Sequence, residues 1–251
     1  MSDKEEKFEN IALNAIIHSY KEEKFAEIME MDRIKPEDLM DSLSLEKNRN
    51  MVFKAGEGAG QSGSFFFFSH DNRYLIKTLR GNEKSKMLEI LDDYIDHIRK
   101  TKNKSLLARI YGIFTIKTDY FDPLDVIVMQ NTSILKNKKN DKLSYDLKGS
   151  YVGRKTRFSP DDDKFWMKKL NCKNVLKDLN YLEMNQDLHS SLMNLTSTQF
   201  DELEWLLKLD SIFLKNHDLM DYSLLLVIEN VPVDLNFLDS SLNKTMFDLV
   251  S

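Results

Sequence analysis

The sequence predicts an α+β fold with an antiparallel sheet and helices in its N-terminal part. Apolar runs at residues 65–68 and 74–79 flank a turn at Asp71-Asn72, and two further runs follow at 106–116 and 124–130. Together with a strand at 51–54, the first two runs have the pattern of an antiparallel meander, and the later two runs predict two more strands. Residues 83–101 and 198–215 carry apolar side chains at helical spacing.

Composition limits the class of protein. The chain has 251 residues, of which 41% are apolar, which suits one large domain or two packed lobes. A net charge of −5 argues against bulk nucleic-acid binding. No apolar run approaches the roughly 18–20 residues that a membrane span needs, and no signal peptide is expected. Cys172 is the single cysteine, so a disulfide framework and a cysteine-based zinc site are excluded and a cytoplasmic setting is expected.

The first 45 residues are expected to form helices that pack on the rest of the chain. Apolar residues recur at three- and four-residue steps across residues 4–31, which predicts one amphipathic helix. Pro36, followed by two acidic residues, predicts the start of a short second helix.

Several shorter signals complete the predicted elements. Strands are expected at residues 51–54, at 144–147 and, as a buried strand, at 224–228. Ser159-Pro160 predicts a helix start, and Thr198 with Asp201 predicts a capping box that opens a helix reaching about Lys215.

The charge is unevenly distributed. Residues 1–46 hold 13 acidic and 6 basic residues, whereas residues 136–157 hold 8 basic and 2 acidic residues. The basic segment is either a solvated loop or an anion-binding face.

A glycine cluster offers the first chemical signal. Gly58 to Gly63 match G-x-G-x-x-G, and Ser64 and four phenylalanines follow. A dinucleotide site needs a helix directly after the glycines, whereas phenylalanines favour a strand. Strand, glycine loop and strand is the kinase arrangement, in which backbone N–H groups approach the ATP phosphates. An ordinary glycine-rich hairpin is the alternative.

Lys77 lies inside the apolar segment that follows this loop. An ammonium group among core-facing neighbours needs an anion. In kinases the lysine of this strand holds the nucleotide phosphates and pairs with a helix glutamate, for which Glu83 and Glu89 are the candidates. A lysine that reaches water at the sheet edge is the alternative.

A second polar cluster, His217 to Ser223, follows the strongest helix. A protein kinase has its catalytic loop at this place, with an asparagine five residues after the aspartate. Counting from Asp218, that position is Ser223, so an ordinary protein kinase is disfavoured.

Six ordered motifs make the resemblance specific. Asp146-Leu147-Lys148-Gly149-Ser150 and Met220-Asp221-Tyr222-Ser223-Leu224-Leu225 resemble signature strings of the phosphatidylinositol phosphate kinases. Further matching strings are Gly60-x-Ser62-Gly63-Ser64, Ile76-Lys77-Thr78, Val128-Met129-x-Asn131 and Leu176-Lys177-Asp178-Leu179. The resemblance covers about residues 15–230.

The resemblance implies roles for individual residues. Asp221 would position or deprotonate the inositol hydroxyl, and Lys148 would assist at the ATP phosphates. The implied nucleotide-binding residues are Lys77, Gly60, Ser62, Gly63, Ser64, Lys148 and Asp178. Mg-ATP is the implied cofactor, and the basic run through Arg154, Lys155 and Arg157 would suit an anionic membrane surface.

The sequence departs from the family pattern in two places. The family's metal-binding aspartate and activation segment follow the Met-Asp-Tyr-Ser string, and the 30 residues after Asp221 do not reproduce them. The metal ligands are therefore unknown, although Asp239 is a weak candidate. Asn180 stands where the family usually has a second acidic residue.

Together these features predict a kinase-like, SAICAR-synthetase-like two-lobed fold with an incomplete C-terminal lobe. The expected parts are a helical segment (1–45), an N-terminal lobe (46–183) and a partial C-terminal lobe with the catalytic loop (184–251). The expected function is phosphorylation of a phosphatidylinositol monophosphate, peripherally at a membrane, with a homodimer by analogy. A non-catalytic pseudokinase that binds phosphoinositide or nucleotide, and a pure interaction domain, are the alternatives.

Overall fold

The computed structural model describes residues 15–49, 65–133, 142–157, 175–187, 195–220 and 222–229. The chain divides into two compact units. Unit 1 comprises Met1–Ile134 and Trp205–His217, and unit 2 comprises Leu135–Glu204 and Asp218–Ser251. The domain limits expected from the sequence remain a prediction.

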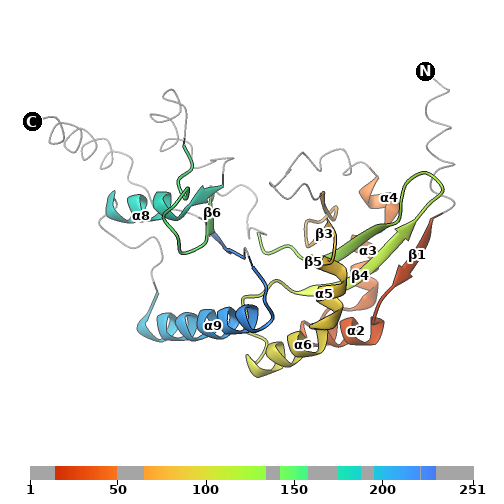
Figure 1. Cartoon of the computed structure of the whole chain (residues 1–251), viewed down its shortest axis with the longest axis horizontal. Coiled ribbons are helices and arrows are strands. Elements are labelled where there is room, and N and C mark those ends of the chain that lie inside the picture. Colours follow the sequence, from red (N-terminus) through yellow and green to blue (C-terminus); the bar gives the residue numbers. More distant parts are fainter. Residues whose placement is uncertain are drawn as a thin grey trace, which may run out of the picture. The chain divides into compact units, whose positions relative to one another are not determined.

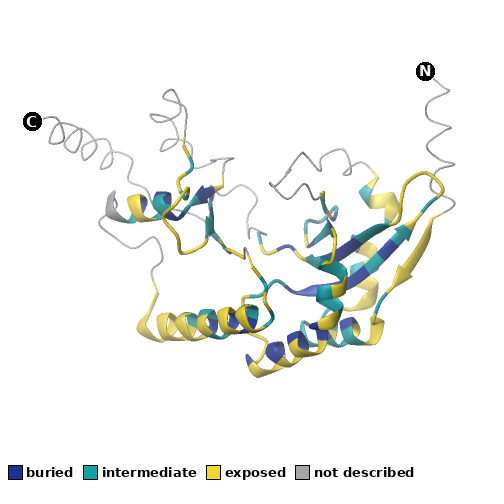
Figure 2. Ribbon diagram, viewed as in Figure 1, coloured by how far each residue is buried: buried dark blue, intermediate teal, exposed yellow. Residues whose placement is uncertain are grey.

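Unit 1 is built on a five-stranded sheet with the order β1-β4-β5-β3-β2, in which all neighbouring strands are antiparallel (Figure 1). The strands are β1 (Ile16–Ser19), β2 (Phe66–Phe68), β3 (Tyr74–Thr78), β4 (Ile110–Lys117) and β5 (Leu124–Gln130). The antiparallel sheet and its β2–β3 hairpin are therefore confirmed, but the strand order is not a simple meander, because β3 pairs with β5 and not with β4. Its central strands contain most of the buried sheet residues (Figure 2).

Five helices lie in the described residues of the first part of unit 1. They are α2 (Glu22–Met31), α3 (Pro36–Ser42), α4 (Leu45–Asn48), α5 (Glu83–Glu89) and α6 (Leu91–Lys100). The predicted helix over 83–101 is interrupted at Ile90, where α5 ends and α6 begins. Helix α6 buries one face, which includes Tyr94, Ile95 and Ile98 (Figure 2).

The single helix predicted across residues 4–31 is wrong for residues 16–19. Those residues form β1, which pairs with β4 at the edge of the sheet, from Ile16 opposite Lys117 to Ser19 opposite Phe114. Lys21 then adopts a left-handed backbone (φ 50°), and α2 begins at Glu22. Pairing with an open sheet edge outweighed the weak helical preference of four residues. The start of the prediction, residues 4–14, lies outside the described residues.

Unit 2 has a three-stranded sheet with the order β7-β6-β8. Strand β6 (Lys142–Leu147) runs parallel to β7 (Leu176–Lys177) and antiparallel to β8 (Leu224–Glu229), and α8 (Asp178–Asp187) follows β7 directly. The small core consists of Leu143, Tyr145, Leu176 and Met184. The strands expected at 144–147 and 224–228 are confirmed, but β8 is partly exposed and not buried.

Helix α9 (Ser197–Asn216) begins two residues earlier than its predicted capping box implied. Gln199 N–H donates to Thr196 Oγ1 (3.3 Å), and Gln199 Oε1 accepts from Thr196 N–H (2.9 Å). The cap is therefore Thr196 with Gln199, and the proposed pair of Thr198 and Asp201 is wrong, because both of these residues lie inside the helix.

Some predicted elements lie outside the described residues, namely the strand at 51–54, the glycine loop and the helix start at Ser159. Within the described ranges, no helix combines the length and apolar content needed to cross a bilayer.

Candidate active site

Lys77 forms an ion pair with a glutamate in unit 1. It lies in β3, with Phe66 and Ile127 as its neighbours on β2 and β5. Its Nζ donates to Glu83 Oε1 at 3.1 Å, and the side chain is 25% exposed. Glu83 is held in turn, because its Oε2 accepts from Arg80 N–H (2.8 Å). The structure thus pairs the lysine with Glu83, the first of the two candidate glutamates.

Glu89, the other candidate, pairs with Lys86 on α5 itself (3.1 Å). The pairing of Lys77 with Glu83 has the form of the kinase lysine–glutamate pair, in which the carboxylate holds the ammonium ready for an anionic ligand.

A neighbouring polar cluster fastens α5 to the sheet. Lys84 Nζ donates to Asp125 Oδ1 (2.8 Å) and to Tyr20 Oη and Thr115 Oγ1 (both 3.3 Å). The hydrogen bond that Lys84 donates to Asp125 is the main reason that the pKa of Lys84 is raised. Because Lys84 directly follows Glu83, this cluster fixes the helix start that presents Glu83. This cluster was not predicted, although an aspartate inside the apolar run 124–130 was a signal.

The loop after β6 carries Lys148 in unit 2. Lys148 is exposed, and its backbone N–H and that of Gly149 donate to Asp178 Oδ1 at 3.0 and 2.8 Å. Asp178 is the first residue of α8, and only 8% of it is exposed. The structure therefore brings Lys148 and Asp178 together through backbone hydrogen bonds that set the path of the loop. A contact of Asp178 with a nucleotide remains a prediction.

Arg154 completes this arrangement. Its Nε donates to Asp178 Oδ2 (2.8 Å), and its Nη2 donates to the backbone oxygen of Asp146 and to Asp146 Oδ2 (3.0 Å for the latter). Burial by itself would raise the pKa of Asp178, but the guanidinium and the backbone N–H groups outweigh it and hold that pKa below its ordinary value. Both carboxylates are thus charged acceptors.

The departure at Asn180 has a structural reason. Its Oδ1 accepts from the backbone N–H groups of Thr156 (2.9 Å) and Lys177 (3.1 Å), while its Nδ2 donates to the Thr156 carbonyl (3.2 Å). An ionised carboxylate could accept the first two bonds but could not donate the third. Asparagine therefore suits the role that this side chain has here.

Other predicted site residues are placed differently or lie outside the described residues. Gly60, Ser62, Gly63, Ser64, Asp221 and Asp239 belong to the second group. His217 packs against Phe213 in unit 1, with ring centroids 4.5 Å apart. Among the described residues, no three histidine, cysteine, aspartate or glutamate side chains gather into a metal-ligand cluster.

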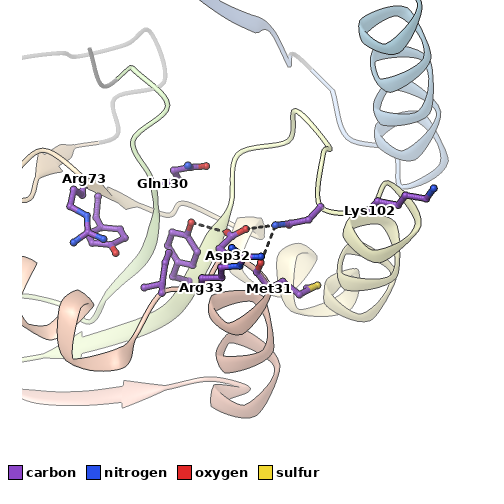
Figure 3. Close-up of a pocket in the computed structure, with 10 residues that line it drawn as sticks. Met31, Asp32, Arg33, Arg73, Lys102 and Gln130 are labelled. Carbon is purple, nitrogen blue, oxygen red and sulfur yellow. Dashed lines mark hydrogen bonds between the residues drawn. The ribbon is translucent and has the colours of Figure 1, made fainter. Parts of the chain in front are cut away.

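A cavity of about 650 Å³ lies elsewhere in unit 1 (Figure 3). Its lining includes Asp32 and Arg33 after α2, with Arg73 across from them, and the Lys102 side chain points away (Figure 3). Tyr74 also lines it, and Tyr74 and Lys77 are three residues apart in β3, so they face opposite sides of the sheet. The cavity is therefore not the pocket of the Lys77 ammonium.

Asp32, which lines this cavity, has a structural role. Its carboxylate accepts from Tyr111 Oη (2.9 Å) and Asn103 Nδ2 (3.1 Å), and lies 3.5 Å from Arg109 Nε. Burial, together with the charge of Asp32, raises the pKa of Tyr111, so the phenol remains a proton donor. These contacts join the end of α2 to β4 and to the turn after α6.

Comparison with known proteins agrees with the motifs. The family model described as Phosphatidylinositol-4-phosphate 5-Kinase matches residues 47–246. A probable phosphatidylinositol phosphate kinase of Dictyostelium discoideum is 32% identical over 206 residues, which cover 77% of this chain and 26% of that protein.

Two further relatives give a similar picture. Phosphatidylinositol 4-phosphate 5-kinase 9 of Arabidopsis thaliana is 33% identical, over 82% of this chain and 22% of its own length. Phosphatidylinositol 4-phosphate 5-kinase its3 of Schizosaccharomyces pombe is 30% identical, over 70% of this chain and 22% of its own length. The chain thus spans about a quarter of the length of these relatives. With its match to the family model over 200 residues and a mixed α/β fold consistent with a kinase, the chain belongs to the phosphatidylinositol-4-phosphate 5-kinase family.

Proposed function

We propose that this chain carries the ATP-binding and hydroxyl-activating parts of a kinase that phosphorylates a phosphatidylinositol monophosphate on its inositol ring. The observation that supports this most directly is the Lys77–Glu83 pair in β3 and α5, within a chain that matches the family model. An ammonium that is held by one carboxylate and still partly exposed can also contact a phosphate oxygen.

In the proposed reaction, the inositol hydroxyl oxygen forms a bond to the γ-phosphorus of ATP while the bridging bond to ADP breaks. The hydroxyl proton passes to Asp221. Lys77 and the segment with Gly60, Ser62, Gly63 and Ser64 would hold the phosphates, and Lys148 would stabilise the transferred group. Mg²⁺ would supply neutralisation of the charge that builds on the phosphoryl oxygens.

The structure suggests how Lys148 is kept in place for this role. Its backbone is held by Asp178, which is held in turn by Arg154. Because a displaced catalytic group loses much of its effect, a fixed loop is what electrostatic stabilisation requires.

The test is transfer of labelled phosphate from Mg-ATP to vesicles that contain phosphatidylinositol 4-phosphate or 5-phosphate. The K77M variant should lose transfer by about 100-fold or more, because one preorganised charge at the phosphates is removed. K86M is the matched control, since Lys86 also pairs with a glutamate on α5 but lies outside the proposed site.

Transfer by the native chain and by K86M, with loss in K77M, supports the proposal. Equal transfer by all three proteins would contradict the role of Lys77. If the native chain transfers no phosphate but binds a fluorescent ATP analogue in a manner that needs Lys77, the chain is a nucleotide-binding module and the catalytic proposal fails.

A further inference from the structure

Two apolar side chains project from the loop that carries Lys148. Tyr151 is 70% exposed and Val152 is 91% exposed. Gly149 and Gly153 flank them, with left-handed backbones (φ 65° and 67°) and no atom within 4 Å of an added Cβ. Residues 148–153 are all exposed (Figure 2). We call Tyr151 and Val152 the apolar tip.

The base of the tip is held on both sides. On the N-terminal side, Asp178 accepts from the Lys148 and Gly149 backbone N–H groups. On the C-terminal side, Arg154 N–H donates to the Tyr151 carbonyl (3.4 Å), and the Arg154 carbonyl accepts from Leu179 N–H (3.0 Å). The backbone thus holds both side chains outward, and none of the described residues covers them.

The charges around the tip are largely compensated. From Lys148 to Arg157 the sequence has four basic residues and no acidic one. In the structure, Arg154 pairs with Asp146 and Asp178, and Lys155 pairs with Glu183 (2.6 Å). Three carboxylates therefore offset most of the positive charge. Arg154 is thus turned into these pairs, and the expectation that the run through Arg154, Lys155 and Arg157 suits an anionic membrane surface remains a prediction.

Because the net charge around the apolar tip is small, burial of its apolar side chains would contribute more to binding of a bilayer than charge would. One basic residue close to an anionic bilayer raises affinity about fivefold, whereas burial of one apolar side chain gives about tenfold or more. A tyrosine beside an aliphatic residue fits the boundary between headgroups and acyl chains, because the ring is apolar and its hydroxyl can stay hydrated.

From this we infer that the apolar tip enters the interface of a lipid bilayer and thereby brings Lys148 to the level of the headgroups. Lys148 is three residues from Tyr151, so their Cα atoms are at most about 10 Å apart. Interfacial apolar groups reach a depth of about 5–10 Å, so Lys148 would remain among the phosphates. The choice of a bilayer rather than a protein partner rests on the proposed lipid substrate.

A fluorescence experiment tests the insertion without any need for catalysis. Cys172→Ser removes the single native cysteine, and Val152→Cys then carries an environment-sensitive dye. Leu182→Cys is the matched control, because Leu182 is an apolar residue of α8 in the same unit and is 41% exposed. Vesicles contain phosphatidylcholine with or without phosphatidylserine and phosphatidylinositol 4-phosphate.

The expected result is a blue shift at position 152 with vesicles and quenching by lipids that carry a quencher near the headgroup, with little change at position 182. The absence of a shift at 152 with every vesicle would overturn the inference and leave a protein partner as the reason for the exposure. Equal shifts at both positions would overturn it too, because unit 2 would then bind without a specific tip.

Activity gives a second readout that separates this inference from the proposed function. The double variant Tyr151→Ser with Val152→Ser should bind vesicles about 100-fold more weakly, if two contributions of about tenfold combine. It should lose transfer to vesicle lipid but keep transfer to a short-chain, monomeric phosphoinositide. Equal loss on both substrates would place the tip in the catalytic site and refute insertion. If the native chain transfers to neither substrate, the proposed function fails, but the fluorescence result still decides the inference.

Discussion

Replacement of Asp210 should lower the stability of unit 1 strongly. Asp210 lies on α9 and is 4% exposed. Its Oδ1 accepts from His97 Nε2 (2.6 Å) and Ser105 Oγ (2.7 Å), and its Oδ2 accepts from Leu106 N–H (2.7 Å). These bonds join α9 to α6 and to the segment that leads into β4. We therefore choose Asp210→Ala as the perturbation.

The expected cost follows from the groups left behind. Replacement by alanine leaves two buried donors, on His97 and Ser105, and the partly buried Leu106 N–H without an acceptor. Each buried donor costs about 1–3 kcal/mol, although water entering the space will recover part of this. Removing one partner from a buried charged network costs about 3–5 kcal/mol, and we expect this value for Asp210→Ala. Asp210→Asn should cost about 2 kcal/mol, because the amide oxygen still accepts but the NH₂ group faces one of the donors. Against a total of about 5–15 kcal/mol, either change is large.

Urea denaturation, followed by tryptophan fluorescence, measures this loss. Trp205 lies on the same helix and reports on its packing. Glu204→Gln is the control, because it also removes a carboxylate charge from α9 but at an exposed position, and it should change stability by less than about 0.5 kcal/mol. If Asp210→Ala unfolds within 0.5 kcal/mol of the native chain, the network does not hold α9 and the reasoning is refuted.

Three further outcomes are expected. Glu83→Gln should weaken binding of a fluorescent ATP analogue about three- to tenfold by loosening Lys77, with Glu89→Gln unchanged; equal effects would contradict the pairing. The pKa of Asp178 is lowered on folding from its ordinary 3.8, so its contribution to stability is complete above that value and is lost as the pH falls through the folded pKa. Acid titration of stability should therefore be flatter in Asp178→Asn, and an unchanged curve would exclude this linkage. Gly112→Ala should cost about 1–3 kcal/mol, because its Cβ would lie 2.5 Å from Phe114 Cε2, and adding Phe114→Leu should restore stability in urea titrations.

The sheet of unit 1 was predictable because each strand is specified by a short run of neighbouring residues. Alternating and aromatic runs, with a turn at Asp71-Asn72, were enough to predict β2 and β3 and their pairing. The pairing of Lys77 with a carboxylate was predictable for a similar reason, since a charged residue inside an apolar strand needs a partner. The choice between Glu83 and Glu89 was not predictable, because it depends on how α5 leaves the sheet.

Elements that depend on distant partners were predicted least well. The helical spacing before Glu22 is real, but β1 forms because the edge of β4 offers backbone hydrogen bonds that a helix prediction does not consider. The contacts of Asp178 and Asn180 could not be predicted from the sequence for the same reason. Their bonding partners are 24 to 30 residues away along the chain, apart from Lys177, and only the fold brings them close.

The position of β1 has a practical consequence for recombinant expression. A protein trimmed to the matched residues 47–246 would lack β1 and α2, and with them the partner of β4. The unpaired backbone of β4 would then be free to pair with strands of other molecules. The residues that Phe25 and Ile28 of α2 normally cover would also be exposed to solvent. Such a shortened protein should aggregate, and purification should keep at least residues 15–46 attached.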